Sequence, residues 1–152
     1  MSSREERRIL GQWGKYTVRR FRPWHMAAIQ QRQYDVKVDG QPTAKVLGFT
    51  ILKGQDVVAC VGVRDLWKGV GEGWVLTSPL VHECPKLFTA LTLRGLRWLE
   101  RNRGYHRIGA RVITSFVEAQ RWAEALGFEF EGPEFAVGPG KEDFYRYGRV
   151  CR

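Results

Sequence analysis

The sequence predicts a mixed α/β fold: a single domain built on a mixed central sheet of about six to seven strands, with helices on its flanks. Three features support this expectation. Residues 45–77 contain three short apolar runs separated by glycine-containing turns, a pattern typical of antiparallel strands. Residues 85–101 carry apolar side chains at helical spacing. Residues 107–132 switch from a strand pattern to a helix pattern and back, as expected for a helix packed on a sheet.

The most specific segment is residues 115–132. Its apolar side chains recur at helical spacing, with charged residues on the other face: Ala119, Trp122, Ala123 and Leu126. Gly127 stands where the end of a helix favours a left-handed residue. Phe128 and Phe130 then alternate with glutamates, which predicts a strand with one buried face.

The other elements are expected in order along the chain. Strands are predicted over residues 16–21, 45–53, 57–63, 72–77, 107–113 and 143–150. Helices are predicted over residues 24–34, after Pro23, and over 85–101, with Pro85 in the first turn. Residues 36–44 are expected to form a loop. We expect residues 1–14 to be a basic N-terminal arm or short helix, and residues 15–152 to form the single domain.

Composition narrows the class of protein. The 152 residues are 43% hydrophobic, enough for one packed core. No apolar run is long enough to span a bilayer and no signal peptide precedes the domain, which favours a cytoplasmic protein without a membrane partner. Cys60, Cys84 and Cys151 lack the spacing of a metal site, so we expect free thiols and no bound metal.

The net charge is +9 and the isoelectric point about 9.9, which favours anionic partners. Arginines cluster on the long helix and just beyond it, at Arg94, Arg97, Arg101 and Arg103. Nucleic-acid contact through these arginines is a third interpretation, which no recognised nucleic-acid motif accompanies.

The order of elements over residues 16–150, with a helix that ends at Leu126, Gly127 and Phe128, resembles the GNAT (GCN5-related N-acetyltransferase) fold. The resemblance implies a GNAT-like domain that transfers an acyl group from acetyl-CoA to an amine. Backbone groups of Val75, Leu76 and Thr77 on a central strand would bind the pantetheine arm. The amine would then attack the thioester directly.

The sequence departs from the family at the phosphate-binding loop. GNAT proteins have a glycine-rich loop there, in which backbone amides approach the cofactor's pyrophosphate at a helix N-terminus. The matching residues, 74–94, contain no glycine, and Pro85 removes one amide donor. In this degenerate loop, Lys86 would neutralise phosphate, and the amides of Glu83, Cys84 and Lys86 would bind the anion.

The candidate catalytic residues are also carried by the resemblance. Glu72, on the central strand, is the predicted base, with Glu83 and His82 as alternatives. Family members often have a tyrosine that protonates the leaving thiolate. Its position here is Ala123, so Tyr145 on the final strand is the predicted substitute.

A closer likeness suggests a different class of function. The chain resembles the small GNAT-like internal virion or assembly proteins of short-tailed bacteriophages, through the residues Trp74, Thr77, Ser78, Ser115, Gly127, Phe144 and Tyr145. This alternative implies a non-catalytic phage or prophage protein that acts in virion assembly or on a host protein, in the host cytoplasm or the virion. Basic faces and surplus tryptophans would form the partner surface.

Overall fold

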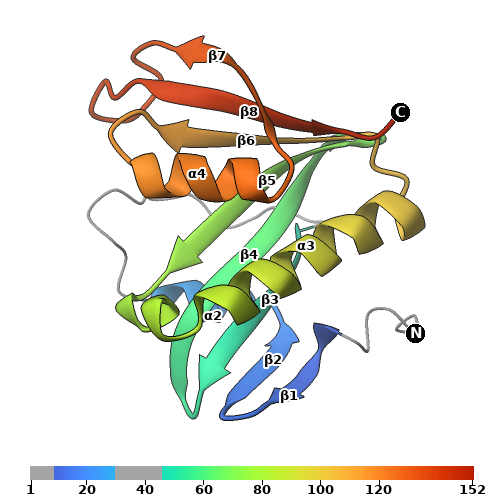
Figure 1. Cartoon of the computed structure of the whole chain (residues 1–152), viewed down its shortest axis with the longest axis vertical. Coiled ribbons are helices and arrows are strands. Elements are labelled where there is room, and N and C mark those ends of the chain that lie inside the picture. Colours follow the sequence, from blue (N-terminus) through green and yellow to red (C-terminus); the bar gives the residue numbers. More distant parts are fainter. Residues whose placement is uncertain (1–8, 30–45) are drawn as a thin grey trace.

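The computed structural model of the chain describes residues 9–29 and 46–152. Within these residues, eight strands form one sheet in the order β1-β2-β3-β4-β5-β6-β8-β7 (Figure 1). All neighbouring strands are antiparallel except β5 and β6, which run parallel, so the sheet is mixed. The predicted fold class is therefore confirmed.

The strands span Gly11–Trp13 (β1), Tyr16–Arg20 (β2), Val46–Lys53 (β3), Asp56–Trp67 (β4), Val70–Thr77 (β5), Arg107–Ile113 (β6), Glu129–Glu134 (β7) and Phe144–Val150 (β8). The sheet has eight strands, one more than the upper end of the expected six to seven, because β1 forms at the end of the predicted N-terminal arm. Strand β4 also runs past the expected end at residue 63. It continues to a hairpin with β5 in which Gly69 adopts a positive φ of 80°.

The helices span Pro23–Ala27 (α2), Pro85–Asn102 (α3) and Val117–Ala125 (α4), with a 3₁₀ turn at Pro79–Glu83 (η1). Prolines occupy the first turns of α2, η1 and α3, where no amide donor is needed. Helix α2 ends at Ala27, earlier than predicted. The rest of that predicted helix from residue 30, the loop expected at 36–44, and residues 1–8 of the predicted arm lie outside the described residues.

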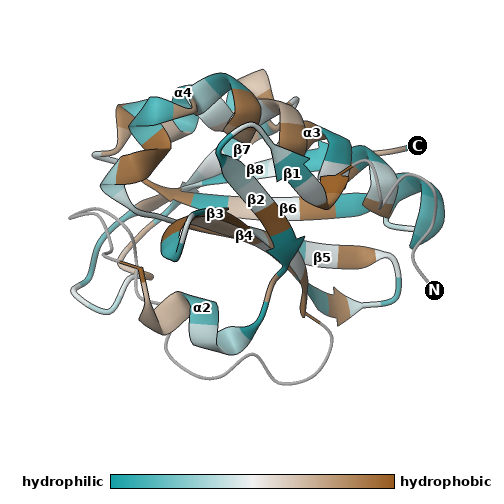
Figure 2. Ribbon diagram, turned by 90° about the horizontal axis from the view of Figure 1, so that it is seen from below, coloured by the Kyte–Doolittle hydropathy of each residue, from teal (hydrophilic) through white to brown (hydrophobic). Residues whose placement is uncertain are grey.

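Helices α3 and α4 cover one face of the sheet, and α2 lies against the other (Figures 1 and 2). Because side chains alternate along a strand, β5 contributes to both layers. Val75 packs in the core cluster beneath α3 with Leu91, while Leu76 packs with Ile29 on the α2 face. The periodic pattern of β5 thus places neighbouring residues on opposite sides of the sheet.

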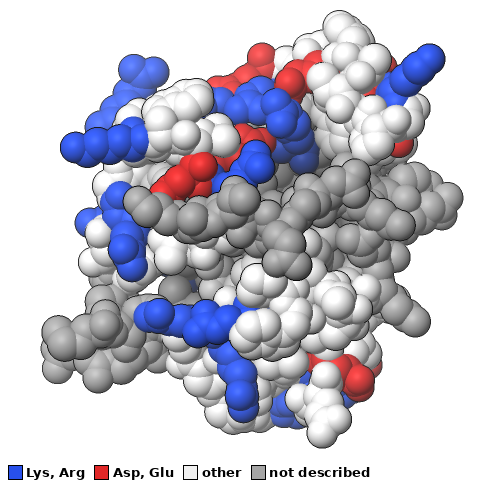
Figure 3. Space-filling view, turned by 180° about the vertical axis from the view of Figure 1, so that it is seen from behind, with Lys and Arg blue, Asp and Glu red and all other residues white. Residues whose placement is uncertain are grey.

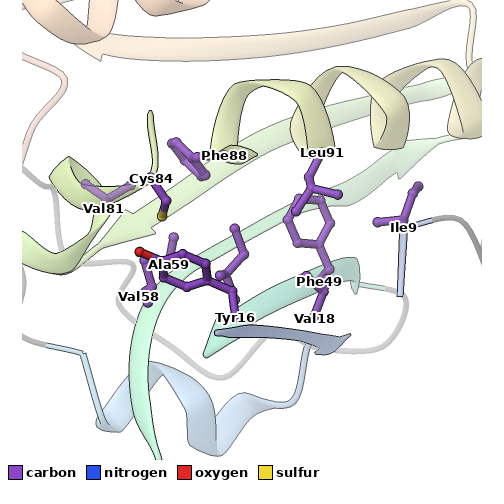
Figure 4. Packing of buried hydrophobic residues seen from close by; sticks show 11 residues of the cluster. Ile9, Tyr16, Val18, Phe49, Val58, Ala59, Val81, Cys84, Phe88 and Leu91 are labelled. Carbon is purple, nitrogen blue, oxygen red and sulfur yellow. The ribbon is translucent and has the colours of Figure 1, made fainter. Parts of the chain in front are cut away.

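The largest core cluster joins the first strands of the sheet to the start of α3. Tyr16 on β2 points its ring toward this helix, with its hydroxyl directed at the Cys84 side chain (Figure 4). Phe49 on β3 packs against Gly95, where a methyl group would lie 3.4 Å from the ring. This packing fixes the beginning of α3 over the sheet.

At the other end of the sheet, Arg149 on β8 contacts both helices of this layer. Its guanidinium pairs with Glu100 on α3 and donates to the backbone oxygen of Leu126 at the end of α4. Both side chains of the ion pair are largely buried. Within the described ranges, no helix is long and apolar enough to cross a membrane.

Candidate active site

Strands β5 and β6 separate in the middle of the sheet. Their register contains three pairs, and the last joins Glu72 to Gly109. Beyond it, β5 continues to Thr77 and β6 to Ile113 without facing each other. The facing edges of both strands are therefore open, and their backbone groups there lack a strand partner.

A cavity of about 870 Å³ occupies the wedge and the space beneath the helices. Its volume lies within the usual range for small-molecule sites. Val75 and Val112 line it on the α3/α4 side, and Phe21 and Trp74 line it on the α2 side. The cavity therefore reaches both faces of the sheet, so that two ligands can approach the wedge from opposite sides.

Two aromatic rings join the helices over the wedge. Phe88 in the first turns of α3 stacks on Trp122 of α4, with centroids 4.6 Å apart and planes 5° apart. The Trp122 indole Nε1 donates to Thr89 Oγ1 at 3.0 Å. Both rings line the cavity. Trp122 is the neighbour of Ala123, the position of the family's tyrosine, and its contact with α3 becomes visible only in the tertiary structure.

The start of α3 lies beside the cavity, and two predicted cofactor-binding residues occur there. The backbone N–H of Cys84 donates to the Val81 oxygen at 3.2 Å, and its side chain is buried. Its amide is therefore already paired. Lys86 is exposed, and its amide belongs to the first helical turn, where no intrahelical acceptor exists. Of these two residues, only Lys86 has an amide without an intrahelical acceptor, and neither residue lines the cavity itself.

Glu72 lies at the apex of the wedge and faces the α2 side. Its carboxylate accepts from Arg146 Nη2 at 3.4 Å, and its side chain is 14% exposed. Arg146 also lies 3.6 Å from Glu134, which pairs with Arg111 at 2.9 Å. The predicted base therefore belongs to an alternating ladder of arginines and glutamates. Sequence alone did not reveal this ladder, because its members come from four strands.

The alternative bases lie elsewhere. The Glu83 carboxylate accepts from Lys53 Nζ at 2.9 Å, and this bond holds the pKa of Glu83 below its ordinary value. His82 is exposed and lines the cavity on the side of η1. Neither residue lies on the face that Glu72 occupies.

Tyr145 is displaced from the site. It lies on β8 opposite Val112, and its ring meets Phe130 edge-on at 5.3 Å. None of the tyrosines in the described parts of the chain lines the cavity. Tyr145 and its neighbour Tyr147 instead pack in the cluster that joins β8 to α4.

On the α2 side, aromatic rings surround the mouth of the wedge. Trp74 lies over Gly62 and meets Phe21 edge-on at 4.7 Å. The ring of His25 lies next to Phe21, at 6.2 Å, and to Trp24, which is 67% exposed. Sequence reasoning assigned no site role to Phe21 or His25, and the one available signal was the run of aromatic residues around Pro23.

His25 is held by two hydrogen bonds. Its Nδ1 accepts from the Arg22 amide at 3.1 Å and lies 2.8 Å from Thr50 Oγ1. Burial, followed by the charges of Arg22 and Arg19, lowers the pKa of His25 below its ordinary value. Since Nδ1 serves as an acceptor, the neutral ring carries its proton on Nε2. His25 therefore caps α2.

The cysteine thiols offer no activated nucleophile in this region. Cys60 is fully buried behind Thr50, and burial raises the pKa of its thiol to about 11. Burial also raises the pKa of Cys84. Cys151 is exposed. All three are free, and two of them are buried, whereas Cys151 departs from the buried or half-buried position expected for these thiols.

Solved structures of GNAT acetyltransferases have the same fold. The chain superposes on a ribosomal-protein-S5-alanine acetyltransferase from Vibrio fischeri with a TM-score of 0.71 and 14% identity, over 91% of this chain and 94% of that one. For a probable GNAT-family acetyltransferase from Chromobacterium violaceum the TM-score is 0.69 and the identity 17%, over 93% and 90%. For a spermidine N-acetyltransferase from Vibrio cholerae the values are 0.67 and 14%, over 90% and 94%.

The sequence itself matches no family model and no curated protein. At these low identities, the structural likeness establishes the GNAT fold, as the sequence predicted, and leaves the activity to be argued from the site. None of the solved structures reported above bears on the likeness to phage virion proteins, which stays a prediction.

Proposed function

We propose that this protein is an acyl-CoA-dependent N-acyltransferase. The observation that carries the proposal is the separation of β5 and β6 beyond Glu72 and Gly109. It opens a wedge that is continuous with a cavity of about 870 Å³, large enough for the acylated end of a thioester carrier. The solved acetyltransferases of the same fold favour this chemistry over other uses of the cavity.

The open strand edges fit the amides of a pantetheine arm. Val75, Leu76 and Thr77 pair with β4 on one side, and those of their backbone groups that point toward β6 have no strand partner. These groups can bond a ligand without any particular side chain, which is compatible with the loss of the glycine-rich loop. Lys86 and the first-turn amides of α3 would hold the phosphates, while Cys84 shapes the turn through its bond to Val81.

Bound acetyl-CoA would supply an acyl thioester to the wedge. If the CoA part of this thioester lies on the α3/α4 side of the sheet, the acceptor amine approaches from the α2 side, where Glu72 lies. The amine nitrogen forms a bond to the acyl carbon, the carbon–sulfur bond breaks, and the thiolate leaves. Glu72 takes the proton that the amine loses, directly or through a water molecule. We assign no residue to protonate the thiolate, because Tyr145 lies outside the lining of the cavity.

Calorimetric titration with acetyl-CoA and with CoA tests the proposal. We expect binding with a dissociation constant on the order of micromolar to millimolar, in the usual range of KM values. Gly73 lines the wedge, and a methyl group there would lie 3.4 Å from its nearest neighbour, the Gly109 oxygen. Gly73→Leu should therefore block binding while Gly73→Ala should retain it.

Two results would contradict the proposal. One is the absence of heat with both ligands at saturating concentration. The other is unchanged affinity in Gly73→Leu, provided that its circular dichroism spectrum matches that of the wild type. Either result would leave the non-catalytic interaction module as the remaining interpretation of this fold.

A further inference from the structure

The surface on the α2 side of the wedge carries an excess of positive charge. Six arginines lie on this face or at the start of α2, against three glutamates at the mouth: Arg19, Arg22, Arg64, Arg107, Arg111 and Arg146, against Glu72, Glu131 and Glu134. Figure 3 shows this face, with acidic and basic side chains gathered in its upper part and basic ones predominating below. The named side chains therefore carry an excess of three positive charges.

Half of these arginines are neutralised within the fold. Arg107 pairs with Glu131, and Arg111 and Arg146 share the ladder with Glu134 and Glu72. These pairs leave no net charge for a ligand.

The other three arginines have no carboxylate partner within residues 9–29 and 46–152. Arg19 and Arg64 are exposed, and the Arg22 guanidinium donates to the Phe21 backbone oxygen at 3.2 Å. Residues 30–45 contain three basic and two acidic residues. Their composition therefore does not reverse the sign of the net charge.

Arg19 and Arg64 both lie on the β4 side of the wedge. Arg64 is the register partner of Glu72, at the apex. Arg19, on β2, is level with Leu76 through Thr50 and Cys60, about 14 Å across the sheet from β5. Two strand spacings across the sheet and four residues along β4 separate Arg19 from Arg64 by about 16 Å. An extended peptide covers that distance with about five residues.

We infer that the acceptor is an amine carried by an acidic peptide segment, and that Arg19, Arg22 and Arg64 bind its carboxylates. This inference rests on the proposed function, which makes the α2 side the acceptor side. A polyamine, itself a cation, would be repelled by the same surface. A continuous phosphate backbone would also cross the neutralised ladder, which offers it no net positive charge, whereas a peptide can place its few carboxylates at the unpaired arginines alone. Trp24 and Trp74 offer apolar contact area beside the charges.

Fluorescence anisotropy with labelled peptides tests this inference independently of turnover. The probe is a short peptide with a free N-terminal amine followed by glutamates, measured with and without CoA, beside a lysine-substituted peptide of equal length. We expect the acidic peptide to bind at least about tenfold more tightly at low salt, and to lose affinity as salt screens the charges. Spermidine should not displace it.

Paired charge reversals locate the binding surface. The double variant Arg19→Glu/Arg64→Glu should bind the acidic peptide about tenfold or more weakly than the wild type does. Arg97→Glu with Arg121→Glu is the matched control, because it makes the same change in net charge at exposed positions on α3 and α4. Arg22 is left intact because its backbone and guanidinium both support the start of α2.

The outcomes separate the two proposals. Preference for the lysine peptide, displacement by spermidine, or equal loss in both double variants would overturn the inference. If oligothymidylate displaces the labelled peptide at a lower concentration than the unlabelled acidic peptide does, the surface is assigned to nucleic acid instead. Acidic-peptide selectivity without any acyl-CoA binding would overturn the proposed function and leave the surface assignment standing.

Discussion

Glu72 on β5 and Gly109 on β6 are the last residues that oppose each other before the two strands separate. The pairing has a steric reason. A methyl group on Gly109 would lie 2.9 Å from Glu72 Oε2 and 2.9 Å from Arg146 Nη2. The missing side chain thus leaves room for the ion pair that holds the Glu72 carboxylate over the apex of the wedge.

Two glycines near the site should respond differently to alanine. At Gly62, the new methyl group would lie 2.5 Å from the Trp74 ring and 2.8 Å from the Leu47 backbone oxygen, so the sheet itself must shift. We expect Gly62→Ala to lower the free energy of unfolding by roughly 1–3 kcal/mol. Gly109→Ala meets the flexible ends of two side chains and should cost less than about 1 kcal/mol. Urea denaturation measures both, and equal losses would contradict this account.

Glu72 and Tyr145 should differ in their effect on acyl transfer. Glu72→Gln removes the proton acceptor and should lower kcat by about a hundredfold or more. Tyr145→Phe keeps the ring that packs on Phe130 and should leave kcat within about twofold. Thiol release from acetyl-CoA in the presence of an acceptor gives both rates. A large fall in the kcat of Tyr145→Phe, with unchanged stability, would support the catalytic role that was predicted for the Tyr145 hydroxyl.

Removing one member of the ion pair between Arg149 and Glu100 should lower the stability of the fold. Arg149→Met leaves the largely buried Glu100 carboxylate without its partner and should lower the free energy of unfolding by about 3 kcal/mol. The double variant Arg149→Met with Glu100→Met removes both charges and should recover most of that loss. Thermal and urea unfolding of the full cycle test this. Additive losses would show that the two residues act independently.

Stability should fall as the pH drops below neutrality, through His25. The pKa of His25 in the folded protein is lowered from its ordinary 6.5, chiefly by burial and then by Arg22 and Arg19. Between the folded and unfolded pKa values the unfolded chain binds more protons, so acid favours unfolding. The contribution is present above about pH 6.5 and is lost as the pH falls through the folded pKa.

The physical cause of that loss is the bond to Arg22. A proton on Nδ1 would remove the acceptor that caps α2. We therefore expect His25→Gln to flatten the dependence of the unfolding midpoint on pH, whereas His82→Gln, at an exposed position, should preserve it. Identical pH profiles for wild type and His25→Gln would rule out this assignment.

Several parts of the site followed from local patterns. The strand at residues 107–113, the helix that starts at Pro85 and the break after Leu126 were predicted correctly, because each depends on spacing and on glycine or proline within a few residues. The position of Glu72 on a central strand also followed from this order of elements. The Arg146 partner of Glu72 could not be predicted, since 74 residues of chain separate the two side chains.

The order of strands and helices, the loop without glycine and the basic character of the chain can all be read from local patterns and composition. The point where β5 and β6 separate and the pairing of the arginines with carboxylates emerge only in the folded protein. Periodicity and turn propensity act between near neighbours in the chain. Strand register and ion pairing join residues that meet only after the sheet has formed.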